Sequence, residues 1–122
     1  MKEQKLDEVF LWACRFGQFE VLKLAVEKGV DIHVHNDYGF EWACARGHLE
    51  VVKFLVEKGA NIHANNDAGF RGACYNGHLE VVKFLVEKGV VIDEIWNEYS
   101  YPEKIVNYLK TQNKKIAITF KP

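Results

Sequence analysis

A repeat with a fixed period of 30 residues dominates the sequence. The segment GHLEVVKFLVEKG occupies residues 47–59 and returns unchanged at 77–89, and GQFEVLKLAVEKG at 17–29 is a diverged third copy. Residues 31–60 and 61–90 are identical at 21 of 30 positions. Self-similarity at a fixed period of this length is the signature of stacked structural repeats. We therefore expect the 122-residue chain to form a single repeat domain.

Each repeat is predicted to begin with a short helix. In the second copy, Asp37 precedes an i, i+3, i+4 apolar stripe made of Phe40, Ala43 and Cys44. Asp is a favoured N-cap, so we expect Asp37 to cap this first helix. Gly47 then ends it.

A second helix is expected over residues 49–58, with Gly59 as its left-handed C-cap. Its apolar positions are Val51, Val52, Leu55 and Val56. A two-helix unit of this size cannot bury its own apolar faces, so neighbouring units must stack. The sequence therefore predicts an all-α solenoid.

The repeated residues closely resemble the ankyrin repeat. The run ACARGHLEVVKFLVEKGANI at 43–62 and its near copy ACYNGHLEVVKFLVEKGVVI at 73–92 carry the recurrent glycines, the Gly-His step and the paired apolar positions. The similarity covers about residues 6–92. Ankyrin units usually span about 33 residues and open with T-P-L-H, whereas this chain has YGFE at 38–41 and AGFR at 68–71. The shorter unit resembles the form abundant in large DNA viruses.

The resemblance implies three full helix-turn-helix repeats, at about 7–36, 37–66 and 67–92, followed by a truncated capping unit at 93–122. In that last unit, KIVNYLKTQN repeats the apolar pattern of the preceding second helix at an offset of 24 residues. The matching positions are Ile105, Val106, Tyr108 and Leu109. We therefore expect the cap to keep a second helix, with Pro102 near its start.

The tail is predicted to be extended. Ile116, Ile118 and Phe120 alternate with smaller residues, which is the period-2 pattern of a strand. Such a segment could close the array, pair with the sheet edge of a partner or be disordered.

A glycine interrupts a repeated tryptophan position. Trp12 and Trp42 occupy equivalent places in the first two repeats, but the third has Gly72. We expect Trp96 or Tyr99 to pack over Gly72 and fill the space.

The cysteines are predicted to be buried thiols. Cys14, Cys44 and Cys74 recur every 30 residues. Equivalent residues on packed helices lie about 8–10 Å apart, whereas a disulfide needs Cα atoms closer than about 7 Å. A framework of bridges is therefore not expected.

The histidines give no clear metal site. The resemblance implies that His48 and His78, in the Gly-His step, are structural imidazoles bonded to nearby backbone. His33, His35 and His63 lie in loops without the convergent third or fourth ligand that zinc needs. We predict no metal and no cofactor, although a small metal-dependent regulator that uses the loop histidines is an open alternative.

No catalytic motif is present in the sequence. Ser100 is its only serine and lies outside a GxSxG motif, and the chain contains neither a P-loop nor GxGxxG. We therefore predict that the protein is not an enzyme.

The positions that vary between repeats are the candidate binding residues. The resemblance places them on the concave groove of the array, and Tyr and Arg are enriched at interface hot spots. The predicted partner-binding residues are Phe16, Tyr38, Glu41, Arg46, Arg71, Tyr75 and Asn76. We predict a protein–protein interaction module, with neutral drift at exposed sites as the alternative explanation of the variation.

A second functional hypothesis uses the ends of the array. Phe10 and Leu11 are unusually apolar for an N-terminal face, and Ile118 and Phe120 are apolar at the other end. A structural or self-associating protein could use these faces.

Charge and hydropathy exclude several partners. Sixteen Lys and Arg residues against seventeen Asp and Glu give a net charge of −1, which disfavours nucleic acid and membrane surfaces. No apolar run approaches the roughly 20 residues of a membrane span, and the charged start lacks a signal-peptide core. We predict a monomeric protein of the cytoplasm, or of the host cytoplasm if it is viral.

Overall fold

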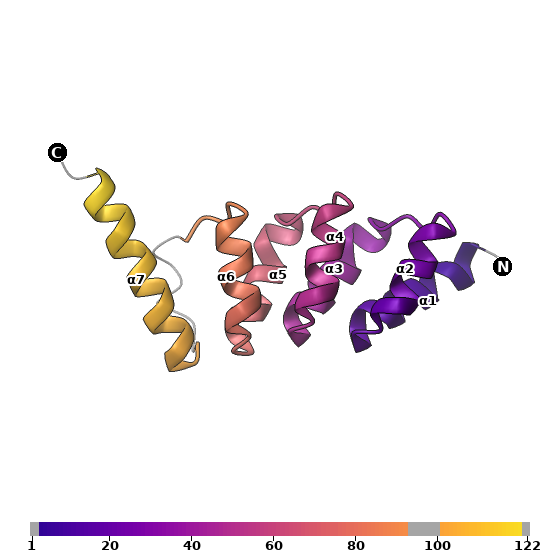
Figure 1. Cartoon of the computed structure of the whole chain (residues 1–122), viewed down its shortest axis with the longest axis horizontal. Coiled ribbons are helices and arrows are strands. Elements are labelled where there is room, and N and C mark those ends of the chain that lie inside the picture. The colour runs from indigo at the N-terminus through magenta and orange to yellow at the C-terminus, as the bar shows by residue number, and fades with distance from the viewer. Residues whose placement is uncertain (1–2, 93–100, 121–122) are drawn as a thin grey trace.

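The computed structural model is an elongated array of helices (Figure 1). It describes the backbone of residues 3–92 and 101–120 and the side chains of residues 5–92 and 101–112. The helices are α1 (Glu3–Phe16), α2 (Phe19–Glu27), α3 (Val34–Arg46), α4 (Leu49–Glu57), α5 (Ala64–Tyr75), α6 (Leu79–Glu87) and α7 (Glu103–Phe120). The described residues contain no strand, so the predicted all-α class is confirmed.

The helices form two rows. Consecutive helices pack as pairs, α1 with α2, α3 with α4 and α5 with α6. The first helices α1, α3 and α5 then pack side by side, and the second helices α2, α4 and α6 form the other row, in front in Figure 1. Helix α7 packs against α6 and extends the second row. This stacking is the predicted solenoid.

The core lies between the rows. The predicted stripe of the first helix is confirmed, because Phe40, Ala43 and Cys44 are all buried. From the second helix, Val51 and Leu55 are buried against it. The same positions are buried in the neighbouring repeats, so one apolar layer runs along the array.

Two close approaches between repeats require glycine. Gly47 ends α3 with a φ of +77°, and the ring of His78 lies where its Cβ would be. Gly39 is helical, but a Cβ there would lie 2.8 Å from Cε2 of Phe10 and 2.9 Å from Sγ of Cys14 on α1. Any side chain at Gly39 would therefore push α3 away from α1.

The starts of α3 and α5 differ from the prediction. His35, Asn36 and Asp37 have φ values of +54°, +58° and +61°, so one left-handed turn precedes the right-handed helix. Asn65, Asn66 and Asp67 repeat this turn. Asn, Asp and His tolerate this region better than other non-glycine residues, which explains the composition of both turns.

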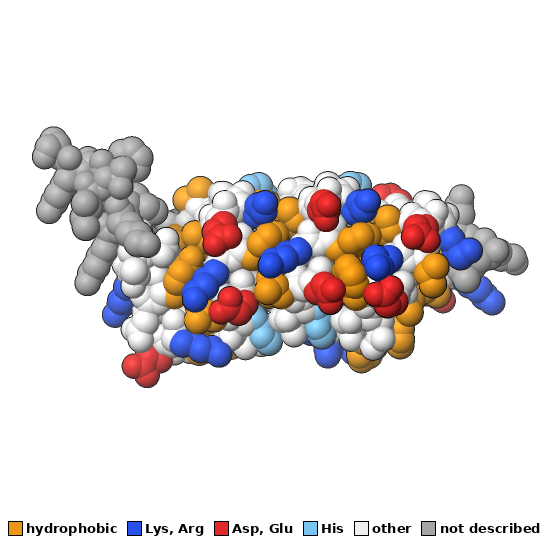
Figure 2. Space-filling view, viewed as in Figure 1, with side chains coloured by type: hydrophobic (Ala, Val, Ile, Leu, Met, Phe, Trp, Pro, Cys, Tyr) orange, Lys and Arg blue, Asp and Glu red, His pale blue; other side chains and the backbone are white. Residues whose placement is uncertain are grey.

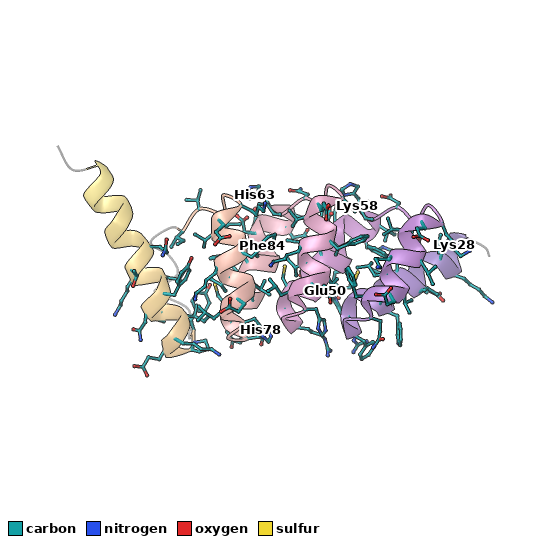
Figure 3. The ribbon with its side chains drawn as sticks, in the orientation of Figure 1. Lys28, Glu50, Lys58, His63, His78 and Phe84 are labelled. Atoms are coloured by element: carbon teal, nitrogen blue, oxygen red, sulfur yellow. The ribbon has the colours of Figure 1, made fainter. Side chains whose placement is uncertain are left out.

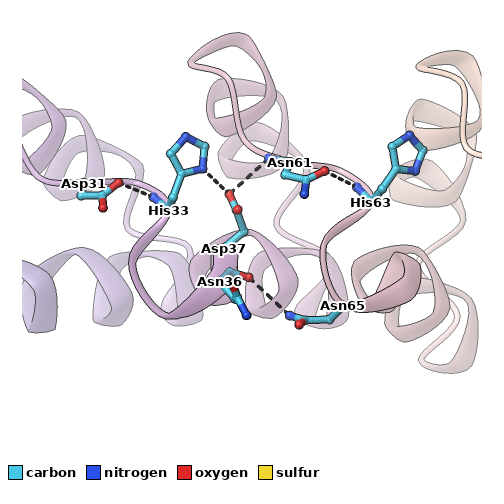
Figure 4. Close-up of polar contacts among 7 residues, drawn as sticks. All are labelled: Asp31, His33, Asn36, Asp37, Asn61, His63 and Asn65. Carbon is cyan, nitrogen blue, oxygen red and sulfur yellow. Dashed lines mark hydrogen bonds and ion pairs between the residues drawn. The ribbon is translucent and has the colours of Figure 1, made fainter.

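The expectation that Asp37 caps its own helix is therefore wrong. Its Oδ1 atom accepts hydrogen bonds from Nδ1 of His33, at 2.9 Å, and from the backbone N–H of Asn61, at 3.2 Å (Figure 4). The left-handed turn aims the carboxylate at the next repeat, so Asp37 joins two repeats.

Side-chain amides add further bonds between repeats. Asn65 donates from Nδ2 to the carbonyl of Asn36, at 3.3 Å (Figure 4), and Asn76 donates to the carbonyl of Ala45, at 3.0 Å. The bond from Asn76 satisfies a backbone acceptor that α3 leaves free at its C-terminal end.

The C-terminal unit is partly as predicted. Ile105 and Leu109 on α7 are fully buried, as are their counterparts Val81 and Leu85, and Pro102 lies directly before the helix. The prediction of an extended tail is wrong, because α7 continues to Phe120. No glycine or proline interrupts residues 103–120, and the described residues offer no sheet for a strand to join.

The space beside Gly72 is partly explained. A Cβ at Gly72 would lie 3.1 Å from Cβ of Ala45, so α3 and α5 approach closely there. Trp96 and Tyr99, predicted to cover this glycine, lie outside the described residues.

The two Asp-His pairs give a matched stability test. Asp37→Ala removes the acceptor of an N–H in the next repeat. Asp67 is 36% exposed in its side chain, against 8% for Asp37, and among the described residues it bonds only to His63 of its own repeat. Because a hydrogen bond to a charged group contributes about 1.5–3 kcal/mol, Asp37→Ala should lower the free energy of unfolding by about 2 kcal/mol more than Asp67→Ala. Urea denaturation measures both, and equal losses would contradict the proposed link.

Candidate functional site

The outer surface made by α2, α4 and α6 carries balanced charge. Figure 2 shows Lys, Arg, Asp and Glu side chains of both signs interspersed with apolar ones across this face. Lys23 pairs with Glu20 at 3.3 Å and Lys83 with Glu80 at 3.8 Å, both at i, i+3 spacing on exposed helix. Such pairs contribute only tenths of a kcal/mol. This face is an ordinary solvated surface.

An apolar groove lies between α1 and α3. It has a volume of about 310 Å³. Its lining residues are Glu8, Leu11, Trp12, Arg15, Phe16, Tyr38 and Trp42, and we call it the aromatic groove. Trp12 is 48% exposed, Phe16 45% and Tyr38 39%, so large apolar rings face solvent here.

The rings of the aromatic groove are packed against one another. Tyr38 and Trp42 meet edge to face with centroids 5.2 Å apart, and Trp12 and Phe16 are tilted at 5.7 Å. Such pairs stabilise by about 0.5–1.5 kcal/mol beyond the area that they bury. The groove is therefore formed before any partner arrives.

Two arginines stack on the same rings. The guanidinium carbon of Arg15 lies 4.3 Å from the centroid of Trp42 and 5.2 Å from that of Phe16. The guanidinium carbon of Arg46 lies 5.5 Å and 5.8 Å from these two centroids. These are cation–π distances, so both cations are held beside the groove.

A polar hollow adjoins the aromatic groove. It is lined by Arg15, Phe16, Ala45, Arg46, His48, Asn76 and His78, so it shares Arg15 and Phe16 with the groove. Its lining contains no Asp or Glu. Among the described side chains, no carboxylate lies within ion-pair distance of Arg15 or Arg46.

A third depression lies over α5. It has a volume of about 440 Å³, and we call it the tyrosine hollow. Its lining residues are Glu41, Ala68, Arg71, Gly72, Tyr75, Asn76 and Tyr101. Tyr75 is 60% exposed, and Gly72 stands where a tryptophan fills the equivalent place in the other repeats.

All seven predicted binding residues line one of these three depressions. Phe16 and Tyr38 lie in the aromatic groove, Arg46 and Asn76 in the polar hollow, and the remaining three in the tyrosine hollow. Those three are Glu41, Arg71 and Tyr75. The structure thus brings the variable positions together, and their role in binding stays a prediction.

Some of these residues also hold the array together. Arg71 donates to the carbonyls of Asn65 and Asn66, both at 3.1 Å, and Glu41 accepts from Nδ2 of Asn65 at 3.2 Å. Arg71 is therefore tied to the backbone of its own repeat, unlike Arg15 and Arg46.

Sequence reasoning missed three residues of this surface. Trp12, Arg15 and Trp42 were absent from the predicted binding set, although they line the groove with the most exposed rings. The signal was available, because a tryptophan repeated at a position where the third repeat has glycine cannot be a required core residue.

The N-terminal apolar face is smaller than predicted. Phe10 is fully buried against Gly39, so its proposed exposure on a self-associating face is wrong. Leu11 is half-buried and lines the aromatic groove. The side chains of Ile118 and Phe120 lie outside those that the structure describes.

The histidines lie at opposite edges of the array. Figure 3 shows His63 where the chain enters α5 and His78 at the other end of the third repeat. His48 bonds through Nε2 to the carbonyl of Arg15 at 2.9 Å, as the resemblance implied. His33 and His63 each bond one carboxylate, and no group of three potential metal ligands occurs among the described residues.

The three thiols are buried, as predicted. Burial raises the pKa of Cys14 and of Cys74 to about 12 and raises that of Cys44 still further, with a contribution from Glu41. Because the thiolate is the reactive form, none of these groups is a nucleophile at neutral pH.

Comparison with protein families identifies the repeat. The model described as ankyrin repeats (3 copies) matches residues 2–66, and the ankyrin repeat model matches residues 73–97. The chain therefore belongs to the ankyrin repeat family. Ankyrin repeats are generally protein–protein interaction modules, and proteins built from them are typically non-enzymatic.

Two further results bear on partners. No curated protein matches the sequence significantly. No helix among the described residues is both long enough and apolar enough to cross a membrane.

The buried thiols predict a pH dependence of stability. An unfolded thiol ionises near pH 8.5, whereas the folded thiols retain their protons to about pH 12, as for Cys14. Above pH 8.5 the native state therefore binds more protons than the unfolded state, and the free energy of unfolding should fall as pH rises, by up to about 1.4 kcal/mol per pH unit for each thiol.

Urea denaturation between pH 7 and pH 10 measures this slope. A variant that combines Cys14→Ala, Cys44→Ala and Cys74→Ala should lose most of it. A slope unchanged in that variant would show that the thiols do not ionise on unfolding.

Proposed function

We propose that this protein binds a partner protein through the face formed by α1, α3 and α5. The observation that carries the proposal is the concentration of exposed aromatic side chains on this face, from Trp12 and Phe16 to Tyr75. Soluble domains seldom expose several large rings together unless they meet a partner.

The arrangement supports recognition more than chemistry. The rings are braced by cation–π and edge-to-face contacts, so little side-chain entropy is lost when a partner covers them. We infer that the protein is a non-enzymatic module that works as a monomer in the cytoplasm. Its binding residues include the seven predicted from sequence, together with Trp12, Arg15 and Trp42.

The shortness of the repeat favours the helices over the loops as contact elements. With about three residues fewer than the usual unit, the loop that precedes α3 and the loop that precedes α5 are each taken up by the left-handed turn. A partner would therefore meet mainly the side chains of α1, α3 and α5.

Affinity capture from lysate of the source cell tests the proposal. The native chain is compared with a variant that combines Arg46→Glu and Tyr75→Ala, both at exposed positions of the proposed face. The captured partner should be depleted at least about tenfold, because truncation of a hot-spot side chain costs 2 kcal/mol or more.

A matched control carries Glu57→Ala and Lys58→Ala, which are exposed at the end of α4 on the outer row. This control should retain the partner. Equal capture by all three proteins would refute the proposed face, and loss with the control alone would move the binding site to the outer row.

A further inference from the structure

The geometry points to the chemistry of the partner. We propose that the aromatic groove and the polar hollow together bind an acidic peptide segment that has an apolar anchor residue with carboxylates on one side of it. This inference rests on the proposed function, since it assigns a ligand class to part of the same face. The anchor occupies the groove, and the carboxylates pair with Arg15 and Arg46.

Arg15 and Arg46 are the reason for expecting carboxylates in the ligand. Both guanidinium groups lie within 6 Å of the Phe16 and Trp42 rings, so they are held close together. Among the described side chains, neither has a carboxylate within 4.0 Å. Two adjacent unneutralised cations repel each other, and a carboxylate placed between them relieves that repulsion. A planar guanidinium also pairs with a carboxylate through two parallel hydrogen bonds.

The favourable interaction of a cation with a helix C-terminus explains only part of the placement of the two arginines. Arg15 and Arg46 lie in the last turns of α1 and α3, where a cation is favourable. Helix α5, the first helix of the third repeat, has no basic residue in its last turn. A helix-end role therefore does not explain why both arginines lean over the same two rings.

The hollow beside them is lined by polar side chains that carry no negative charge. His48, His78 and Asn76 complete its polar lining, and no Asp or Glu is present there. His48 already bonds the carbonyl of Arg15, and Asn76 bonds that of Ala45, so their rotamers are fixed. Within the polar hollow a negatively charged segment meets no carboxylate, whereas Glu41 lines a separate depression with Tyr38, Trp42 and Arg46 and is bonded to Asn65.

The aromatic groove selects a peptide over a small anion. Its volume of about 310 Å³ suits one bulky side chain, and its walls are the rings of Trp12, Tyr38 and Trp42. A free carboxylate would leave these rings exposed. A Leu, Phe or Trp side chain covers them and brings its flanking residues to Arg15.

Charge also determines on which side of the anchor residue the carboxylates of the segment lie. Glu8 lines the far side of the groove, two helical turns before Arg15, which is about 10 Å along α1. An extended chain advances about 3.3–3.6 Å per residue. The carboxylates should therefore lie two to four residues from the anchor on the Arg15 side, and an acidic residue on the Glu8 side is disfavoured.

Fluorescence anisotropy of synthetic 12-residue peptides against the full chain tests this inference. One peptide carries Phe with Glu at the second to fourth positions after it. A second has the same composition with the three Glu residues before Phe, and a third replaces each Glu by Lys. We expect the first or the second peptide to bind, according to chain direction, at least about tenfold more tightly than the third, with affinity reduced by salt.

Variants connect the preference to the two arginines. Combining Arg15→Gln with Arg46→Gln should weaken the favoured acidic peptide about tenfold. Combining Arg15→Glu with Arg46→Glu should reverse the preference toward the Lys peptide. The matched control combines Lys53→Gln with Lys58→Gln, which also removes two exposed positive charges but on the outer row, away from both depressions, and it should leave the affinity unchanged. Thermal melts confirm that each variant is folded.

The outcomes separate this inference from the proposed function. Equal affinity for the acidic and Lys peptides, lost on Trp42→Ala, would overturn the acidic ligand and leave the proposed face standing. If neither Trp42→Ala nor Tyr75→Ala changes peptide binding, both the acidic ligand and the proposed binding face are overturned. The acidic ligand is also overturned if none of the peptides binds, or if light scattering shows a dimer that Trp42→Ala abolishes, since a second copy would then occupy the groove.

Discussion

Close packing between neighbouring first helices is the constraint on which the rest of this structure depends. Each repeat is too small to bury its own apolar faces, so the array is stable only where repeats touch. At Gly39 that contact leaves no room for a Cβ, because Phe10 and Cys14 of the preceding repeat occupy the space. Gly69 meets Phe40 and Cys44 in the same way, at 3.0 Å and 3.2 Å. Gly39 and Gly69 therefore set how closely neighbouring first helices approach.

The same packing produces the candidate site. Phe10 and Phe40 occupy the contacts between the first helices, and other large rings lie on the face of the row, where Trp12 remains 48% exposed. Bonds between repeats then hold that face rigid, including Asp37 to Asn61 and His48 to the carbonyl of Arg15. The carbonyl bond also anchors the backbone from which Arg15 reaches the ring of Trp42. The contacts that stabilise the array thus also position the side chains of the candidate site.

The sequence predicted the repeats, the buried stripe of Phe40, Ala43 and Cys44, and the family, because all depend on periodicity. It did not predict the left-handed turn at His35 to Asp37, since the preference of Asp for N-caps is local and the carboxylate bonds another repeat instead. The tail was misjudged because alternation over five residues is weaker than the continuation of an uninterrupted helix. Variation between repeats located the face, whereas the stacking of Arg15 on Trp42 depends on residues 27 positions apart and needed coordinates.

The most direct test of the stacking account is the free energy of unfolding of Gly39→Ala, measured by urea denaturation. Gly39 is helical, so alanine would raise stability by about 1 kcal/mol through helix propensity alone. The account predicts the opposite sign, because the new methyl group would clash with Phe10 and Cys14 and separate α3 from α1. A loss of stability would support it. A gain near the propensity value would contradict the claim that this contact sets the spacing of the array.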